Sequence, residues 1–269
     1  MQAKGIQRRL SQLSGHVVQA NFSSVYRKHP LYEIEESIEE RSIVLTPKTE
    51  TKYALIWLHG LGDSAHGFAN LFLEKESSFT PPSCKVVLLT APERPVTLNG
   101  GMMMNSWYDI YSLRGDHIKS LDDLYSKYSR EEMMESVGIV SRRLDREIEL
   151  LKGESTKVFV GGFSQGCALS FATMTHYPKQ LGGVIGLSGM NAIKIDWASV
   201  PKERKATPIC IHHGEDDDMI NHKIALRTYQ EYLDNGFTAM EIKTEAGLGH
   251  HMSLPEINRL RSYLSKLMP

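Results

Sequence analysis

From about residue 42 onward, short apolar runs alternate along the chain with stretches whose apolar residues recur at helical spacing. The apolar runs cover Ser42–Leu45, Tyr53–Leu58, Val86–Leu89, Val158–Val160, Val184–Leu187, Pro208–His212 and Met240–Lys243. Short runs with no polar alternation are typical of strands that are buried on both faces of a sheet. The pattern therefore predicts an α/β domain with a mainly parallel central sheet flanked by helices.

Capping signals mark where several of the helices begin. Ser129 with Glu132, and Ser253 with Glu256, each match the pattern of a capping box ahead of an apolar stripe. A third helix is expected over residues 222–235. No Pro- or Ser-rich linker interrupts residues 42–269, so we expect them to form one domain.

Residues 1–41 differ from the rest of the chain, and we interpret them as an N-terminal extension. The first 32 residues contain no Asp or Glu, and apolar residues recur at helical spacing from Ile6 to Val17. This composition is typical of an organellar transit segment and also fits a helix on a membrane surface; a loosely docked tail is the alternative. The acidic stretch that follows, residues 33–40, is expected to be a solvated linker or a helix face.

Charge and cysteine content narrow the class of protein. Lys and Arg number 31 and Asp and Glu 32, a formal net charge of −1, which is not the basic field that a nucleic-acid-binding protein needs. Cys84, Cys167 and Cys210 are odd in number and widely spaced, so we expect reduced thiols in a cytoplasmic protein. A mitochondrion or another organelle is the alternative if residues 1–32 act as a transit segment. No apolar run approaches the roughly 18 residues of a membrane span, and no spacing of metal ligands is present.

The strongest chemical signal is Gly162-Phe163-Ser164-Gln165-Gly166, which matches the G-x-S-x-G pattern of a nucleophile elbow. An apolar run precedes it, and a helical pattern follows it over Cys167–His176. A tight turn from strand to helix strains the serine backbone and crowds the positions on either side of it, which is why both flanks are glycine. Ser164 is therefore the candidate nucleophile.

A serine hydroxyl becomes an effective nucleophile only when a base removes its proton. Behind an elbow of this kind, the acid and then the histidine follow the serine along the chain. Asp216, Asp217 and Asp218 follow shortly after the run that ends at His212, and chemistry alone leaves the choice among them open. The base is expected on the Gly-rich stretch 247–251, which lies between the last apolar run and the last helix.

Two backbone N–H groups are expected to form an oxyanion hole. One belongs to Gln165, which directly follows the nucleophile, and the other to Leu61, on the Gly-rich stretch His59–Ser64 after an early strand. As a phosphate-binding loop, that stretch lacks the third glycine and the Lys-Ser/Thr pair of the known motifs.

Several stretches, taken together and in order, resemble the acyl-protein thioesterase / phospholipase-carboxylesterase family. They are Leu58–Ser64, Ala91–Asn99, Ser106–Ile110, Gly161–Gly166, His213–Asp217 and Gly247–His250. The resemblance implies an α/β-hydrolase fold and a cofactor-free enzyme that hydrolyses acyl thioesters on proteins, lysophospholipids or short carboxyl esters. It also implies that Asp217 is the acid, that His250 is the base, and that His251 lies at the rim of the pocket.

Other functions on the same scaffold are a general short-chain carboxylesterase, a serine peptidase and a non-catalytic binding protein. A peptidase of this class often carries a further domain, and a binding protein is expected to lack part of the triad. The expected partner is an acylated protein or a lipid ester, with transient contact to a membrane surface; nothing in the sequence indicates an oligomeric state.

An acyl chain needs an apolar groove, and adaptable Met side chains suit one. The candidate groove residues are Leu98, Met102, Met103, Met104, Trp107 and Met190; the alternative is that some of them belong to the core. The sequence departs from the family pattern in residues 1–41, in the long charged stretch Leu113–Arg130 and in Leu187–Ala192. The last two stretches are expected to border the acyl site. Acyl-length preference is therefore the family property that the resemblance carries over least to this chain.

Overall fold

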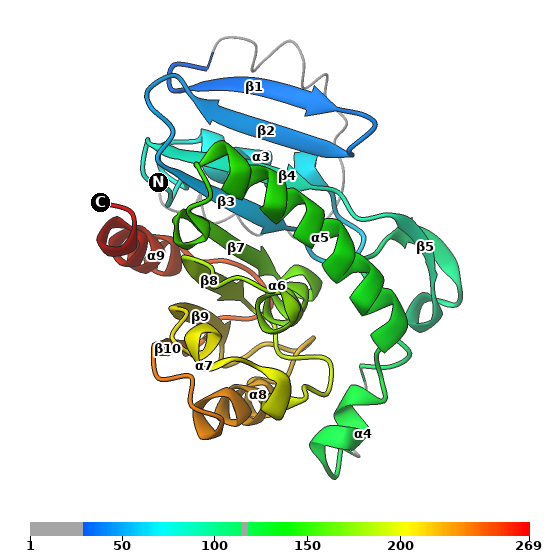
Figure 1. Cartoon of the computed structure of the whole chain (residues 1–269). Coiled ribbons are helices and arrows are strands. Elements are labelled where there is room, and N and C mark those ends of the chain that lie inside the picture. The colour runs from blue at the N-terminus through cyan, green and yellow to red at the C-terminus, as the bar shows by residue number, and fades with distance from the viewer. Residues whose placement is uncertain (1–28, 114–117) are drawn as a thin grey trace.

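The computed structural model describes residues 29–113 and 118–269, and its centre is a sheet in the strand order β1-β2-β4-β3-β7-β8-β9-β10 (Figure 1). The six strands β4, β3, β7, β8, β9 and β10 run parallel to one another. Strand β2 pairs antiparallel with β4, and β1 pairs antiparallel with β2. The strands are β1 Tyr32–Ser37, β2 Ser42–Pro47, β3 Tyr53–Leu58, β4 Cys84–Leu89, β7 Val158–Phe163, β8 Gly183–Leu187, β9 Ile209–Gly214 and β10 Met240–Glu245. All seven predicted strands are present, and the predicted mainly parallel sheet is confirmed.

Helices cover both faces of the sheet. The described helices are α3 Ala65–Leu73, α4 Leu121–Tyr125, α5 Arg130–Leu150, α6 Gln165–His176, α7 Lys202–Lys205, α8 His222–Asp234 and α9 Leu254–Leu267, with short 3-10 turns η1 Thr97–Asn99, η2 Ser155–Lys157 and η3 Trp197–Ser199. Helices α5, α6 and α8 share one apolar cluster with the sheet, and α3 and α9 share a second cluster on the opposite face.

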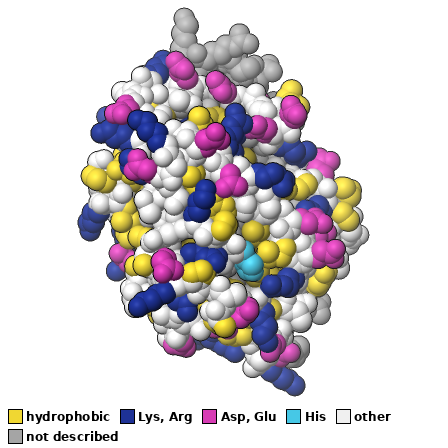
Figure 2. All heavy atoms as spheres, viewed as in Figure 1, with side chains coloured by type: hydrophobic (Ala, Val, Ile, Leu, Met, Phe, Trp, Pro, Cys, Tyr) yellow, Lys and Arg dark blue, Asp and Glu magenta, His cyan; other side chains and the backbone are white. Residues whose placement is uncertain are grey.

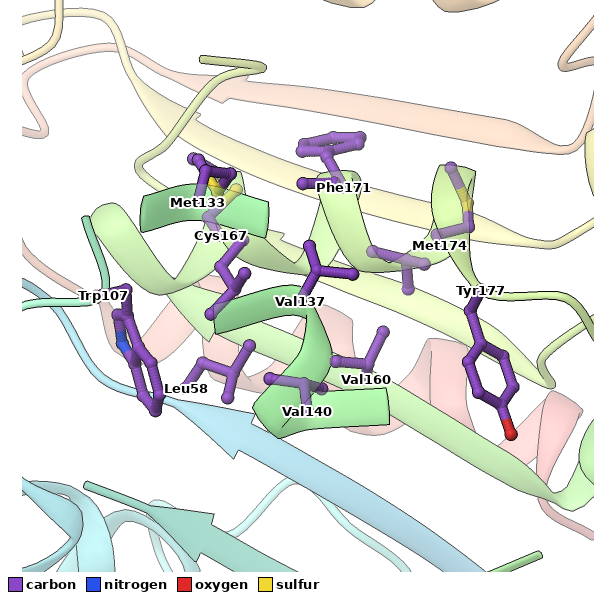
Figure 3. Packing of buried hydrophobic residues seen from close by; sticks show 14 of the residues in the cluster. Leu58, Trp107, Met133, Val137, Val140, Val160, Cys167, Phe171, Met174 and Tyr177 are labelled. Carbon is purple, nitrogen blue, oxygen red and sulfur yellow. The ribbon is translucent and has the colours of Figure 1, made fainter. Parts of the chain in front are cut away.

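Strand β3 explains why its sequence has no polar alternation. Ile56 and Leu58 belong to the cluster under α5 and α6, while Leu55 and Trp57 belong to the cluster under α3 and α9. Both faces of this central strand are therefore buried, as expected for a parallel sheet between two helical layers. Figure 3 shows the first cluster, in which Val140 of α5 and the α6 side chains lie over the sheet.

The two predicted capping boxes differ in the structure. At Ser253 the box is complete, because the Ser253 hydroxyl accepts from the Glu256 N–H and the Glu256 carboxylate accepts from the Ser253 N–H. At Ser129 only the first half forms. The Glu132 carboxylate instead accepts from the backbone N–H of Asp109, so the start of α5 is tied to a loop of the candidate site.

The acidic stretch was predicted to be a linker or a helix face, and this prediction is wrong. Residues 32–37 form β1, the edge strand that pairs with β2. Tyr32 is buried and Ile34 packs against the second cluster, while Glu33 and Glu35 point into solvent. This alternation with a period of two is typical of a strand with one face buried. The predicted boundary between residues 41 and 42 therefore does not separate β1 from the sheet. Of the transit segment predicted over residues 1–32, residues 1–28 lie outside the described residues.

A small hairpin that the hydrophobic pattern did not predict stands beside the main sheet. It consists of β5 Glu93–Val96 and β6 Met102–Asn105, joined through η1 (Figure 1). Across the described residues, none of the helices has the length and apolar character needed to cross a membrane. On the face shown in Figure 2, basic and acidic side chains are interspersed rather than gathered by sign.

Candidate active site

Ser164 occupies a strained turn between β7 and α6. Its φ of 55° and ψ of −114° lie in a region that non-glycine residues rarely adopt. The flanking glycines are required sterically, because a Cβ on Gly166 would lie 2.1 Å from the Leu58 carbonyl oxygen and one on Gly162 would lie 2.5 Å from the same atom. The predicted elbow is therefore present in its expected place, at the carboxyl end of a central strand.

Loops after β9 and β10 bring two further side chains to Ser164. His250 Nε2 lies 2.9 Å from Ser164 Oγ, and His250 Nδ1 lies 2.8 Å from Asp217 Oδ2. A carboxylate only accepts, so Nδ1 donates to Asp217 and leaves the Nε2 lone pair for the serine proton. The structure thus brings together the three residues that the sequence placed far apart, and His250 rather than His251 makes both contacts.

Asp217 is the buried member of its acidic run, while Asp216 and Asp218 are exposed. Its Oδ1 accepts from the backbone N–H groups of Met219 and Ile220, at 2.9 and 2.7 Å. Burial alone would raise the pKa of the Asp217 carboxyl. Hydrogen bonds from His213, His250 and the Ile220 N–H outweigh burial and lower that pKa well below its ordinary range. Asp217 is therefore an ionised acceptor across the neutral pH range.

The loop that carries Leu61 is held by His59. The Ala91 N–H donates to His59 Nε2 over 2.9 Å, so the ring proton resides on Nδ1, which lies 2.6 Å from the Gly60 carbonyl oxygen. Burial lowers the pKa of His59 to about 4, which keeps the ring neutral. Asn105 adds a second clamp, because its carbonyl accepts from the Gly62 N–H over 2.9 Å. Within the described part of the chain, no hydrogen-bond acceptor lies against the Leu61 N–H.

Trp107 was predicted to line an acyl groove, and the structure places it in the core instead. Its side chain is fully buried beside Leu58 (Figure 3) and donates from Nε1 to the His59 carbonyl oxygen over 2.9 Å. Its backbone N–H donates to the Gln165 side chain over 2.9 Å. Trp107 therefore connects the Leu61 loop to Gln165, the residue that follows Ser164.

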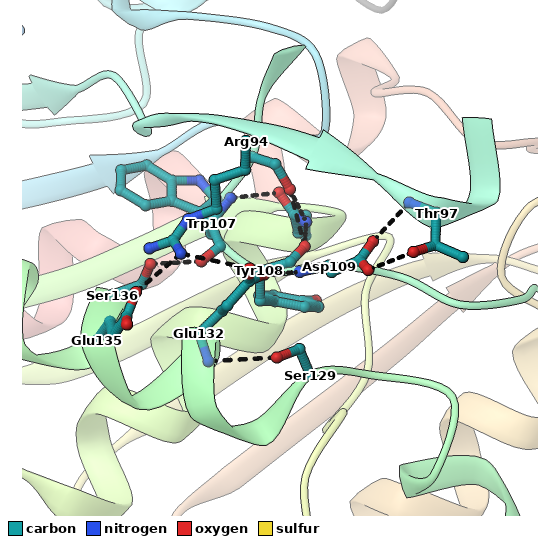
Figure 4. A network of polar contacts seen from close by, with 11 residues as sticks. Arg94, Thr97, Trp107, Tyr108, Asp109, Ser129, Glu132, Glu135 and Ser136 are labelled. Carbon is teal, nitrogen blue, oxygen red and sulfur yellow. Dashed lines mark hydrogen bonds and ion pairs between the residues drawn. The ribbon is translucent and has the colours of Figure 1, made fainter. Parts of the chain in front are cut away.

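A polar network anchors the segment around Trp107 to α5 (Figure 4). The Asp109 N–H donates to Glu132, and the Asp109 carboxylate accepts from the Thr97 N–H over 2.7 Å. Arg94 lies 2.8 Å from Glu135 and 3.5 Å from Glu132. The segment that contacts the Leu61 loop through Asn105 and Trp107 is thus itself attached to α5.

An apolar pocket of about 150 Å³ opens beside Ser164. Its lining includes both predicted oxyanion residues, Leu61 and Gln165, and two of the six predicted groove residues, Leu98 and Met190. Leu113, Tyr128 and Ala192 also line the pocket, and they lie in the two stretches, Leu113–Arg130 and Leu187–Ala192, that were expected to border the acyl site. The rest of the apolar wall was not named as groove residues and consists of Tyr108, Ile110, Ala168, Met219 and Ile220. Several of these directly flank quoted motifs, and that proximity is the signal that could have identified them.

The three consecutive methionines do not line this pocket. Met102 and Met103 are 63% and 60% exposed on the β5–β6 hairpin. Met104 lies toward the Leu61 loop, with its sulfur 3.3 Å from the Asn99 side-chain nitrogen. Neighbours on a strand point to opposite faces, so a run of three cannot all face one groove. Among the described residues, no group of three or more His, Cys, Asp or Glu side chains could hold a metal ion.

Comparison with known proteins agrees with this architecture. The family model described as phospholipase/carboxylesterase matches residues 39–268. An acyl-protein thioesterase 1 homologue from Dictyostelium discoideum is 34% identical over 239 residues, which cover 87% of this chain and 99% of that protein. The carboxylesterase SOBER1 from Arabidopsis thaliana is 34% identical over 215 residues, 79% of this chain and 89% of that protein.

Solved structures give the same result. The crystal structure of Arabidopsis thaliana SOBER1 matches with a TM-score of 0.69 and 30% identity, covering 81% of this chain and 99% of that chain. Zea mays acyl-protein thioesterase 2 matches with a TM-score of 0.68 and 28% identity, covering 85% of this chain and 99% of that chain. The chain therefore belongs to the phospholipase/carboxylesterase family of the α/β-hydrolase fold and is a hydrolase of the esterase class.

Proposed function

We propose that this protein is a serine hydrolase that cleaves acyl thioesters, including S-palmitoyl groups on proteins, and carboxyl esters such as lysophospholipids. The observation that carries the proposal is the chain of hydrogen bonds from Ser164 through His250 to Asp217, beside an apolar pocket. The names of the relatives support thioesters and carboxyl esters as the substrate classes.

In the first half of the reaction, Ser164 Oγ attacks the acyl carbonyl carbon while His250 Nε2 takes the hydroxyl proton. The N–H groups of Leu61 and Gln165 donate to the oxyanion that forms. The carbon–sulfur or carbon–oxygen bond then breaks, and the protonated His250 returns its proton to the departing thiolate or alkoxide. The products of this half are a free thiol or alcohol and an acyl ester on Ser164.

In the second half, His250 takes a proton from water, and the resulting nucleophile attacks the acyl ester on Ser164. The oxyanion again accepts from the two N–H groups. Its collapse releases a fatty acid and returns the proton to Ser164. Throughout, Asp217 keeps the His250 ring in one orientation and stabilises its charged form, because the carboxylate accepts a hydrogen bond from the Nδ1–H group.

The surroundings of Ser164 support an apolar acyl group. The pocket beside Ser164 shares Leu113, Tyr128, Met190, Met219 and Ile220 with a groove of about 460 Å³, so the two spaces have a common wall. In this proposal the first carbons of the acyl chain fill the pocket and longer chains continue into the groove. A general short-chain carboxylesterase is the second candidate, because the pocket alone, at about 150 Å³, suits a short acyl group.

For the compartment we propose the cytoplasm, with transient contact to the membrane where lipidated substrates lie. Cys84, Cys167 and Cys210 are free and buried, which fits a reducing environment. A transit function for residues 1–32 predicts an organelle instead, and the location of a chain lacking them distinguishes the two.

The test is a series of acyl thioesters and matching oxygen esters of increasing chain length, hydrolysed by wild type, Ser164→Ala and Ser265→Ala. Ser265 lies on the exposed face of α9, so it controls for the same chemical change away from the site. We expect Ser164→Ala to lose at least ~10³-fold in kcat/KM and Ser265→Ala to match wild type. Wild-type rates in Ser164→Ala would refute the proposal. A wild-type protein that hydrolyses only short-chain esters would favour the general short-chain carboxylesterase.

A further inference from the structure

His213, the penultimate residue of β9, contacts the triad carboxylate from the side opposite the solvent. It is 1% exposed. Its Nε2 lies 2.8 Å from the Ile220 carbonyl oxygen and 3.3 Å from Asp217 Oδ2. Its Nδ1 lies 3.1 Å from the Tyr229 hydroxyl. The proposed mechanism assigns this residue no part.

The hydrogen-bond partners of the His213 ring determine how many protons it carries and therefore its charge. The Tyr229 hydroxyl contacts the Gly189 carbonyl oxygen, which only accepts, so the single phenolic proton points there. The Tyr229 oxygen must then accept from His213, which places a proton on Nδ1. At the other nitrogen, the Ile220 carbonyl also only accepts, which places a proton on Nε2. Both ring nitrogens donate, and the ring is therefore an imidazolium.

The charges around His213 agree with this count. Among the described residues, the titratable groups that face the ring are Asp217, from the loop after β9, and Tyr229, from α8. Burial, with smaller contributions from Cys167 and Asp217, raises the pKa of Tyr229 far above its ordinary value, so Tyr229 keeps its proton. Cys167 of α6 stays a neutral thiol because burial raises its pKa too. The imidazolium therefore has one counter-charge, the carboxylate of Asp217.

We propose that His213 is a positioning residue, protonated on both ring nitrogens, that holds the Asp217 carboxylate in the orientation that aligns His250. Asp217 Oδ2 lies between the two rings, and its Oδ1 is fixed by two backbone N–H groups, so the carboxylate has no freedom to rotate. The inference deepens the proposed function and depends on it for its kinetic consequences only.

A direct test determines the protonation state of the two His213 ring nitrogens. The full chain is labelled with ¹⁵N-histidine, and long-range ¹H–¹⁵N spectra are recorded between about pH 6 and about pH 8. We expect one buried ring with protons on both nitrogens across this range, and its signals are assigned by their loss in His213→Gln. A His213 ring with one bare nitrogen near neutral pH would overturn the proposal.

Tyr229→Phe is the matched variant, because it removes a single hydroxyl, which is both the acceptor for His213 Nδ1 and the donor to the Gly189 carbonyl oxygen. We expect the His213 ring to lose its Nδ1 proton in this variant and to become neutral. If both protons persist, the proton count is wrong. This measurement needs no activity, so it remains decisive even if the proposed function fails.

A kinetic test asks whether the ring acts on the triad. His213→Gln keeps an N–H donor but carries no charge. We expect kcat to fall ~10- to 100-fold with little change in KM, because the Asp217 carboxylate loses a partner and its alignment. We also expect the acid limb of the kcat/KM profile to move to higher pH, because removing a cation beside Asp217 favours the protonated form of His250. Unchanged kcat and an unmoved acid limb in a folded variant would show a merely structural role and overturn the proposal.

Discussion

Gln165 Nε2 donates to the Tyr108 carbonyl oxygen over 2.7 Å, so the residue that follows Ser164 is hydrogen-bonded to the segment that also holds the Leu61 loop. The two proposed oxyanion donors therefore share one support. Trp107 links the two parts of this support. Its backbone N–H donates to the Gln165 side chain, and its indole N–H donates to the His59 carbonyl oxygen.

Gln165→Ala tests this support. The variant keeps the Gln165 backbone N–H but leaves the buried Trp107 N–H without an acceptor. We expect about 1–3 kcal/mol lower stability in urea unfolding. We also expect kcat to fall about tenfold at nearly constant KM, since the oxyanion donors lose their alignment. Gln230→Ala on the exposed face of α8 is the control and is expected to match wild type in both measurements. A stability loss with unchanged kcat would contradict the shared support.

Gly166→Ala tests the close packing under the elbow. Its Cβ would lie 2.1 Å from the Leu58 carbonyl oxygen, a backbone atom that cannot move aside. We expect a loss of about 3 kcal/mol or more in thermal unfolding, together with loss of activity. Gly138→Ala on α5 is matched, because its Cβ meets nothing nearer than 3.7 Å. That variant is expected to gain up to about 1 kcal/mol. Equal effects of the two changes would refute the steric argument.

Glu256 gives the fold a defined pH dependence. Burial raises the pKa of its carboxyl to about 8, and the hydrogen bond from the Ser253 N–H only partly offsets this. The raised folded-state pKa means that its contribution to stability is full below about pH 4 and is lost as pH rises through about 8. In Glu256→Gln the side chain is neutral at every pH and still accepts from the Ser253 N–H, so this variant does not lose stability as pH rises.

We therefore expect Glu256→Gln to be more stable than wild type at about pH 8, by up to roughly 3–5 kcal/mol, and close to wild type near pH 4. Glu241→Gln on β10 is the control, because this side chain is 47% exposed. The measurement is the free energy of unfolding across the pH range. A constant difference between Glu256→Gln and wild type at every pH would contradict the burial argument.

Leu98→Trp tests the pocket wall. Leu98 lines the pocket beside Ser164, so the larger indole shortens the space for the acyl chain. We expect kcat/KM on long acyl esters to fall at least ~10-fold while acetyl or butyryl esters change little. Met103→Trp on the exposed hairpin is expected to leave the profile on these soluble esters unchanged. A shift of the chain-length profile by Met103→Trp and not by Leu98→Trp would place the acyl site on the hairpin.

The elements that define this fold could be read from the sequence because each is encoded locally. Six of the seven predicted strands are short apolar runs, and the seventh, β10, alternates apolar and polar residues at the edge of the sheet. The Gly-x-Ser-x-Gly stretch demands a strand before it and a helix after it. The pattern did not predict β1, because the high charge of residues 32–37 masks the alternation of Tyr32 and Ile34 and favours a linker or a helix face. The strands of the β5–β6 hairpin are too short to give a clear hydrophobic pattern. The order of serine, acid and histidine predicted that an acid from Asp216–Asp218 and a histidine from residues 247–251 would meet Ser164. The family resemblance was needed to select Asp217 and His250, which are the residues that make the contacts.

The pocket wall could not be predicted in the same way, because it depends on which face of each loop turns inward. Trp107, Met102 and Met103 have the chemistry of a groove, yet one lies in the core and two lie in solvent. Whether a side chain lines a pocket is decided by long-range packing, which the residue type does not encode. His213 illustrates the same limit: it lies within a recognised motif, but its partners Tyr229 and Ile220 come together only in the folded chain.

The central claim, that Ser164 is the nucleophile, is tested most directly by covalent labelling. The full-length protein is treated with a fluorophosphonate, digested and examined by mass spectrometry. We predict a single adduct on Ser164 in wild type and in Ser265→Ala, a slower adduct in His250→Ala, and none in Ser164→Ala. An adduct on another residue in wild type, or equal labelling of Ser164→Ala, would contradict the account.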